Sequence, residues 1–376
     1  MRSLLLLLSA TLAAAQSGPR VQISHTTESM RGVCAVSRQV AWASGTHGTY
    51  LRTVDGGVTW TPAQVPDATT LDFRAVVAFS ADEAFLMSSG LGDGSRIYHT
   101  SDGGKNWQMQ FTNNNPKGFF DAMAFWDPKH GLVLGDPVRD DSGKLKFEIL
   151  ETEDGSSWHQ ISSSQLPDAI GGEGAFAASN HSLAILRSGS GTGIQIWFAT
   201  GVKAARVFHS ADGGKTWDVS DTPILHDTDS SGIFAIAFRD PLHGVIAGGN
   251  YKRPRDDGPN LAFTNDGGKT WTLADVHPQA FFSSLAYDQR VNQAAMEQED
   301  AQKSAEQSGK KIRVKPTTPE RIFIVGEDFI FDFRPPNNPR RISGKKKLGI
   351  GFNAISAFPE GGALAVGPKG SIAFIP

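Results

Sequence analysis

The stretch that decides the fold is SADGGKTW, residues 210–217, because the chain repeats it. Related octamers begin at Thr53 (TVDGGVTW), Thr100 (TSDGGKNW) and Thr264 (TNDGGKTW), and a shortened copy, TEDGSSW, begins at Thr152. Successive copies start 47 to 58 positions apart. Repetition of a motif at a period of about 50 residues is typical of propellers and solenoids.

Each octamer has the composition of a tight turn between two strands. The Asp side chain can accept hydrogen bonds from backbone N–H groups a few residues on, and the second Gly stands where a positive φ is expected. The Trp can cover the turn with a large apolar face. We therefore interpret these residues as structural rather than catalytic. They are Asp55, Gly57, Trp60, Asp102, Gly104, Trp107, Asp154, Trp158, Asp212, Gly214, Trp217, Asp266, Gly268 and Trp271.

The octamers belong to longer units made of short apolar runs. Each unit begins with a strand-like run rich in small residues. A second run follows, then a third that leads into the octamer, and then a fourth that starts at the Trp. The first runs begin at Arg31, Arg74, Phe120, Glu173, Ile233, Phe282 and Asn353. Seven units of four antiparallel strands predict an all-β, seven-bladed β-propeller. The last unit has only three strands, so we expect Arg20–Thr26 to supply its fourth strand and close the ring.

The bounds of the propeller domain can be inferred from the local composition of the chain. Residues 1–15 resemble a secretory signal peptide, with Arg2 before an apolar run and three alanines at the cleavage site. We expect a cut after Ala15, a secreted or periplasmic protein, and one propeller domain over residues 16–376. A polar, helix-forming insertion at about residues 291–319 interrupts the sixth unit, and basic residues gather between 334 and 347.

Composition also limits the function. The net charge of -3 gives no general attraction to nucleic acid or to an anionic membrane. Cys34 is the only cysteine, so an internal disulfide is excluded. The sequence contains no phosphate-binding loop, nucleophile elbow or dinucleotide fingerprint. We predict a monomer without cofactor or metal, and we do not expect catalytic activity.

The face opposite the octamers carries the irregular sequence, at residues 135–146 and 248–260. Binding residues are concentrated in such loops. Aligning the first runs on their Ala–aromatic pairs places the starts of these runs around the mouth of the central channel. Two adjacent arginines there, Arg31 and Arg74, could hold a carboxylate or phosphate. The candidate binding residues on this face are Arg31, Arg74, Asp121, Asp136, Arg139, Glu173, Asn250, Tyr251, Lys252, Arg253 and Asn353.

The acidic members of this set leave an alternative open. Asp121, Asp136 and Glu173 could supply the two carboxylates that a glycoside hydrolase places across its sugar. The alternative to a protein-binding or peptide-binding propeller is therefore an extracellular, sialidase-like glycoside hydrolase or a carbohydrate-binding propeller.

The octamers resemble the Asp-boxes of sialidases and sortilin-type receptors, a motif that indicates fold more than function. The runs at residues 42–60, 232–251 and 365–373 (WASGTHGTYLRTVDGGVTW, GIFAIAFRDPLHGVIAGGNY and AVGPKGSIA) resemble the photosystem II assembly and stability factor family of seven-bladed propellers. The resemblance implies a non-catalytic protein that binds a membrane-protein subunit or its precursor during assembly. The arginines of the family's basic patch correspond loosely to Arg31 and Arg74. Secreted bacterial relatives often carry the label oxidoreductase, which the missing dinucleotide fingerprint does not support.

Overall fold

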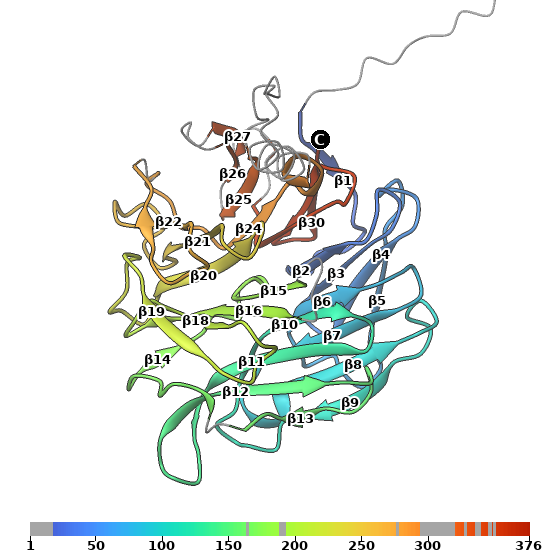
Figure 1. Cartoon of the computed structure of the whole chain (residues 1–376). Helices are drawn as coiled ribbons and strands as arrows, with labels where there is room; N and C mark the ends of the chain where they lie inside the picture. Colours follow the sequence, from blue (N-terminus) through green and yellow to red (C-terminus); the bar gives the residue numbers. More distant parts are fainter. Residues whose placement is uncertain are drawn as a thin grey trace, which may run out of the picture.

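The computed structural model describes residues 18–162, 165–187, 193–275, 278–293, 320–326, 329–334, 340–344, 348 and 351–376. Their strands form seven antiparallel sheets arranged around a central axis (Figure 1), so the predicted all-β, seven-bladed propeller is confirmed. The expected signal peptide at residues 1–15 and most of the insertion expected at 291–319 lie outside the described residues. In the part of the chain that the structure describes, no helix has the length and apolar character needed to cross a membrane.

We number the blades 1 to 7 in the order of their inner strands. Each blade contains four strands, ordered from the central axis to the periphery, and in blade 5 two further short strands, β14 (Glu173–Gly174) and β17 (Gly201–Val202), extend the sheet beyond its inner strand. The inner strands are β2 (Met30–Ala35), β6 (Phe73–Ala78), β10 (Phe120–Asp127), β15 (Leu183–Arg187), β20 (Ser231–Phe238), β24 (Ser284–Tyr287) and β28 (Ala354–Ala357). The second strands are β3 (Ala41–Gly45), β7 (Ala84–Ser88), β11 (His130–Arg139), β16 (Ile194–Ala199), β21 (Gly244–Asn250), β25 (Ile322–Gly326) and β29 (Ala363–Gly367). The third strands are β4 (Thr49–Thr53), β8 (Arg96–Thr100), β12 (Leu145–Thr152), β18 (Arg206–Ser210), β22 (Leu261–Thr264), β26 (Phe329–Phe333) and β30 (Ser371–Ile375). The outer strands are β5 (Thr61–Gln64), β9 (Gln108–Thr112), β13 (His159–Gln160), β19 (Asp218–Asp221), β23 (Thr272–Leu273), β27 (Arg340–Gly344) and β1 (Arg20–Gln22).

The N-terminal strand closes the ring. β1 pairs with β30 in antiparallel register, with Val21 opposite Ala373, and becomes the outer strand of blade 7 (Figure 1). The strand is shorter than expected, because only Arg20–Gln22 of the predicted Arg20–Thr26 joins the ladder. The pairing covers the edge of β30 and leaves the short β1 as the outer edge of blade 7, and a short edge strand offers little surface for association with another chain.

The hydrophobic core lies between the blades. Seven clusters of buried side chains each join one blade to the next, including blade 7 to blade 1. In the cluster between blades 1 and 2, Trp42 and Tyr50 stack with ring centroids 5.9 Å apart and pack beside the buried Leu86. Burial of apolar area at each junction therefore stabilises the ring as a whole.

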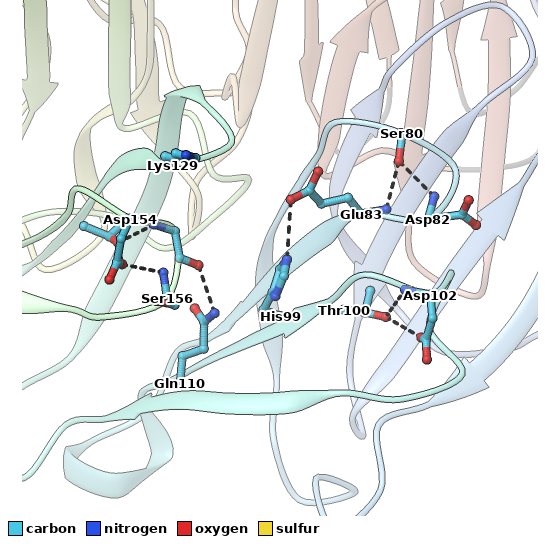
Figure 2. A network of polar contacts seen from close by, with 12 residues as sticks. Ser80, Asp82, Glu83, His99, Thr100, Asp102, Gln110, Lys129, Asp154 and Ser156 are labelled. Carbon is cyan, nitrogen blue, oxygen red and sulfur yellow. Dashed lines mark hydrogen bonds and ion pairs between the residues drawn. The ribbon is translucent and has the colours of Figure 1, made fainter.

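The octamers form the turns between third and outer strands, all on one side of the ring, which we call the octamer face. In blade 2 the Thr100 hydroxyl donates to Asp102 Oδ1 at 2.9 Å (Figure 2). The same hydroxyl accepts the N–H of Gly104 at 3.0 Å. The Asp102 carboxylate also accepts the N–H of Asn106 at 2.9 Å. Gly103 and Gly104 have φ of 77° and 84°, as the two glycines of the motif require.

Some octamers are also fastened to the preceding blade. Gln110 of β9 donates to the carbonyl of Gly155 at 3.0 Å (Figure 2). The side-chain oxygen of Gln110 accepts from the indole of Trp158, also at 3.0 Å. Gln22 of β1 makes the same pair of bonds to Gly56 and Trp60 in the next blade. The turns therefore satisfy their own backbone and also hold neighbouring blades together.

The sequence-based assignment of strands in the fourth unit is wrong. The run that begins at Glu173 was expected to be the inner strand, but the inner strand is β15, which was expected to be the second. The second strand, β16, was not predicted. The error arises because residues 175–182 have the small, apolar composition of an inner strand but lead into β15 along the central axis.

Residues 175–182 are held by several blades. The carbonyl of Ala177 accepts from Arg74 of blade 2 at 2.9 Å, and Asn180 Oδ1 accepts the N–H of Met123 in blade 3 at 2.7 Å. The Ser179 hydroxyl donates to the carbonyl of Ser283 at 2.7 Å, ahead of blade 6. This segment, which we call the axial segment, therefore fills the channel that seven inner strands would otherwise leave open.

Candidate functional site

A pocket of about 410 Å³ lies at the end of the channel opposite the octamer face. We call it the mouth pocket. Its lining comes from all seven blades or the segments that lead into them: Arg31, Arg74, Phe119, Asp121, Asp136, Ala175, Phe176, Ala177, Ala178, Phe234, Tyr251, Phe281, Ser283 and Asn353. Of the predicted binding residues, Arg31, Arg74, Asp121, Asp136, Tyr251 and Asn353 therefore share one pocket.

A β-bulge near the start of four inner strands positions the lining. In β2 the pairing register shifts between Met30 and Gly32, so Arg31 has no partner in β3. The same shift leaves out Arg74 in β6, Asp121 in β10 and Phe234 in β20. Because a bulge redirects the side chain of the extra residue, the repeated irregularity accounts for four of the side chains around the mouth.

The bulges also correct the alignment made from sequence. That alignment placed Phe120, Ile233 and Phe282 at the mouth, and it is wrong by one residue in these units. All three side chains are fully buried, and the following residues, Asp121, Phe234 and Ser283, line the pocket. In these blades the Ala used for the alignment follows the residue at the mouth by three positions, as from Phe234 to Ala237. In blades 1 and 2 it follows Arg31 and Arg74 by four positions.

Arg31 and Arg74 form the basic side of the mouth pocket, and their environments differ. Arg74 donates from Nε to Asp72 Oδ2 at 2.6 Å and from a terminal nitrogen to the axial segment. Arg31 Nε is buried and has no hydrogen-bond partner among the described residues. Burial lowers the pKa of Arg31 to about 10, with a smaller contribution from the charge of Arg74. Arg31 is therefore the arginine available to an incoming anion.

Asp121 and Asp136 form the acidic side, on blade 3. Asp121 is only 1% exposed, and neither of its carboxyl oxygens has a hydrogen-bond partner in the described part of the chain. Burial raises the pKa of Asp121 well above its ordinary range, and the nearby Asp136 adds to the effect. Burial also raises the pKa of Asp136 to about 6, although its Oδ1 accepts the N–H of Ala175 at 2.9 Å.

Aromatic rings form the side of the pocket nearest blades 4, 5 and 6. Phe176 stacks on Phe234 with centroids 3.8 Å apart, and Phe281 meets Phe234 edge to face at 4.7 Å. Tyr251, 45% exposed, lies over the same cluster. Sequence analysis identified only Tyr251 of these four. The phenylalanines were missed because the bulge and the axial segment, which place Phe234 and Phe176, leave no periodic signal.

Glu173 does not belong to the mouth pocket, so its placement at the channel mouth is corrected. β14 (Glu173–Gly174) pairs with β17 (Gly201–Val202), which in turn pairs with the inner strand β20 of blade 5, and the Glu173 side chain is fully buried. Its carboxylate forms an ion pair with Arg206, whose Nε lies 2.9 Å from Oε1, and accepts from the Thr200 hydroxyl. A carboxylate with these partners serves the packing of blade 4.

Arg139 lies in a different, larger depression of about 780 Å³ beside β11 and β12. Its guanidinium donates to the carbonyl of Gly143 at 2.6 Å. Lys144 and Lys146 in the same depression form ion pairs with Asp168. These charges satisfy one another close to solvent, so we regard the mouth pocket, with its unsatisfied buried groups, as the better candidate site.

The other predicted residues of blade 5 stabilise a loop. The side-chain oxygen of Asn250 accepts from Ser230 and from the N–H groups of Lys252 and Arg253. Lys252 pairs with Asp229 at 2.6 Å and Arg253 with Asp256 at 2.9 Å. The loop thereby holds Tyr251 at the mouth while its neighbours face away from the pocket. In the basic run between 334 and 347, Arg334 pairs with Asp332, and residues 335–339 and 345–347 lie outside the described residues.

The mouth pocket suits recognition by charge and shape. No group of three or more His, Cys, Asp or Glu side chains arranged to hold a metal ion occurs among the described residues. A cationic side, a carboxyl pair and an aromatic side meet in a volume that can accept a few side chains of a peptide.

Comparison with known proteins supports the family resemblance. Residues 13–118 match the model of a family described as photosynthesis system II assembly factor YCF48. The photosystem II assembly protein Ycf48 of Thermosynechococcus vestitus is 25% identical in a match 289 residues long, which covers 59% of this chain and 80% of that protein. The expected similarity to this group of propellers is therefore confirmed.

Solved structures show the same fold over nearly the whole chain. A structure titled YCF48 bound to D1 peptide is 16% identical, with a TM-score of 0.61, and the match covers 96% of this chain and 98% of that one. YCF48 from Cyanidioschyzon merolae is 18% identical with a TM-score of 0.59, covering 95% and 98%. The WD40 propeller domain of Doa1 reaches a TM-score of 0.58 at 11% identity, covering 95% and 97%. At these identities the likeness establishes the propeller fold.

Proposed function

We propose that this chain is a non-catalytic propeller that binds a peptide segment of another protein at the mouth pocket and acts in the assembly of a protein complex. The observation that carries the proposal is the pocket itself, where Arg31, whose Nε has no hydrogen-bond partner in the described part of the chain, lies in the same lining as the aromatic cluster. An extended segment can place an acidic side chain or a chain end on the arginine and an apolar side chain on the rings.

The similar proteins suggest which kind of partner this chain binds. The Thermosynechococcus protein is a photosystem II assembly protein, and one similar propeller has been solved with a D1 peptide bound. By analogy, we propose a membrane-protein subunit or its precursor as the partner of this chain. Such a partner would present a flexible terminal segment to a propeller that needs no catalytic group.

We also propose that the chain is exported before it acts. The charge, apolar run and small residues of positions 1–15 support this proposal. Amino-terminal sequencing of the protein from the host should give Gln16 as the first residue, and fractionation should recover the protein outside the cytoplasm. Recovery of an intact Met1 from the cytoplasm would contradict export.

Peptide arrays test the binding proposal directly. Overlapping peptides from the host's membrane proteins would be probed with the wild-type chain and with Arg31→Gln. We expect a limited set of peptides to bind the wild type about tenfold or more tightly than Arg31→Gln, because the variant loses a charge-assisted contact. Arg139→Gln removes an arginine outside the mouth pocket and should bind as the wild type does.

A second candidate function rests on the carboxyl pair. Asp121 and Asp136 line one pocket, and the pKa of Asp136 is raised to about 6, as a general acid requires. Glycoside hydrolysis would appear as release of chromophore from a panel of aryl glycosides, and Asp136→Asn would abolish it. If the purified wild type releases no chromophore at any pH between about 5 and 8, the glycoside hydrolase candidate is removed and the peptide proposal is unaffected.

A further inference from the structure

The acidic side of the mouth pocket has no role in binding an anion. Neither oxygen of Asp121 has a hydrogen-bond partner among the described residues, and the side chain is almost fully buried. A buried polar group without a partner costs free energy, and this one is retained in the lining of an open pocket. The group is therefore placed where a ligand can satisfy it.

The charged groups around Asp121 do not satisfy it. Arg74 lies near enough to favour the ionised carboxylate, but its Nε and one terminal nitrogen bond to Asp72 and to the axial segment. Arg31 of β2 carries the second positive charge of the lining, and Asp136 of β11 is a second carboxyl that opposes ionisation of Asp121. The axial segment, Ser283 and Asn353 bring no charge to the lining, and Tyr251 is the remaining titratable group.

We propose that the mouth pocket selects its peptide through a lysine or arginine side chain, which binds Asp121 and Asp136 while an acidic group of the same peptide binds Arg31. This inference rests on the proposed function and names the chemistry of its ligand. An ammonium or guanidinium group donates charge-assisted hydrogen bonds to both carboxyls. The rings of Phe176 and Phe234 can cover the aliphatic stem of the side chain or lie beside its charge.

The arrangement predicts a requirement for two opposite charges at a fixed spacing. A ligand with only an acidic group would bring a negative charge close to two carboxyls. A ligand with only a cation would face two arginines. A segment that carries both charges satisfies each side, and the wrong charge order is disfavoured, which is how a pocket gains specificity.

Proton release gives a readout that packing alone would not produce. A cation that binds the carboxyl pair lowers the pKa of both carboxyls, which burial has raised. Near neutral pH the complex must therefore lose protons to the solvent as it forms. Affinity should rise as the pH increases through about 6, where Asp136 ionises, and Arg31 stays charged throughout this range.

The test begins with selection of peptides from a random heptapeptide library by the wild type, Asp121→Asn and Arg31→Gln. We expect the wild type to enrich peptides with Lys or Arg at a constant distance from Asp, Glu or the free carboxyl end. Asp121→Asn should still enrich acidic peptides but lose the preference for Lys or Arg, and Arg31→Gln should do the reverse. Melting curves confirm that each variant folds, and Asp136→Asn, which keeps the oxygen that accepts from Ala175, serves as a second acidic-side variant.

Calorimetry in two buffers with different heats of ionisation then measures the binding of two peptides. One is the best peptide selected by the wild-type protein, and the other is a copy with citrulline or norleucine in place of Arg or Lys. We expect the copy and the Asp121→Asn variant each to bind about 10- to 100-fold more weakly, and only the charged peptide to release protons. Enriched peptides that depend on Arg31 but show no Lys or Arg preference, or binding that weakens with rising pH, would overturn this inference and leave the proposed function intact. Enrichment of no peptide by the wild type would overturn both.

Discussion

Carboxylates on the two faces of the ring have opposite environments. On the octamer face, Asp102 accepts the backbone and side-chain N–H groups of Asn106, and these bonds lower the pKa of Asp102 to about 2. At the mouth pocket, burial raises the pKa of Asp136 to about 6, and the Asp121 carboxyl has no hydrogen-bond partner among the residues that the structure describes. A carboxylate that stabilises the fold is fully hydrogen-bonded, whereas those at the mouth reduce stability unless a ligand binds them.

The backbone is regular on the octamer face and irregular at the mouth pocket. The octamer turns of blades 1, 2, 4 and 5 repeat one geometry, with paired glycines at positive φ. At the mouth, the ladder is interrupted by a bulge in four blades, and the bulged residues are two arginines, an aspartate and a phenylalanine. The repeated sequence of the octamer face therefore stabilises each blade in the same way. At the mouth, different residues at equivalent positions form the lining of a pocket.

The largest effect on stability should follow from removing an octamer Trp. Trp60 is 2% exposed and its indole donates to Gln22 of the closing strand. We expect Trp60→Ala to lower the free energy of unfolding by about 3–5 kcal/mol, since it leaves a cavity at the junction between the first and last blades. Urea unfolding measures the change. Trp126→Ala, which removes a partly exposed Trp, should cost much less. Equal losses would show that the octamer Trp has no special role.

Removing the charge of Asp136 should raise the free energy of unfolding, whereas removing the octamer Trp lowers it. Since its folded-state pKa is about 6 and therefore above the unfolded value, the folded state binds more protons than the unfolded state between about pH 4 and 6, and wild-type stability falls as pH rises through that window. We expect Asp136→Asn to be more stable than the wild type above pH 6, by on the order of 2 kcal/mol, and equally stable near pH 4. Unfolding curves at about pH 4 and pH 7.5 measure the difference. A variant less stable at both values would contradict this account of the mouth.

Asp102→Asn should reverse that pH dependence. The pKa of Asp102 is lowered by hydrogen bonds from Asn106, so its contribution to stability is present above about pH 4 and is lost as the pH falls towards 2. We expect the variant to be moderately less stable than the wild type at neutral pH and to approach it at acid pH, with unchanged peptide binding. Thermal melts across this range provide the measurement. An effect on peptide affinity would mean that the two faces are not independent.

The smallest effect on stability should come from Arg31. Its Nε has no partner, so Arg31→Gln removes little that holds the fold together. We expect a change in unfolding free energy within about 0.5–1 kcal/mol, in either direction, together with the loss of peptide binding described above. Arg206→Gln offers the contrast, because it breaks the buried pair with Glu173 and should destabilise blade 4. If Arg31→Gln unfolded the protein as readily as Arg206→Gln, Arg31 would be a structural residue.

Much of the fold could be predicted because it is encoded locally. An Asp, two glycines and a Trp specify a turn by hydrogen bonding and backbone freedom alone, and their repetition specifies the ring. The closing strand could be inferred because the last unit lacked a fourth strand. Blade 4 was assigned wrongly because residues 175–182 have an inner-strand composition, and only contacts with distant blades, such as Arg74 to Ala177, distinguish the two.

The mouth pocket could be predicted in part. Arg31, Arg74 and Asn353 were aligned correctly. For the two arginines, the Ala used in the alignment follows the bulged residue by four positions, as the alignment assumed. Asp121 and Asp136 were identified by their charge and their place near a loop. Phe234 and Phe281 were missed, because a bulge or a one-residue offset changes which side chain reaches the channel. Such offsets depend on pairing between strands and are not visible in a single run of sequence.

Hydrogen exchange with a selected peptide tests the central claim most directly. The account predicts that the peptide slows exchange of the backbone amides at residues 119–123, 175–178, 231–234 and 281–283, which surround the mouth pocket. Exchange at the octamer turns 53–60, 100–107 and 210–217 should not change. Protection of the octamer turns with an unaltered mouth would contradict the account.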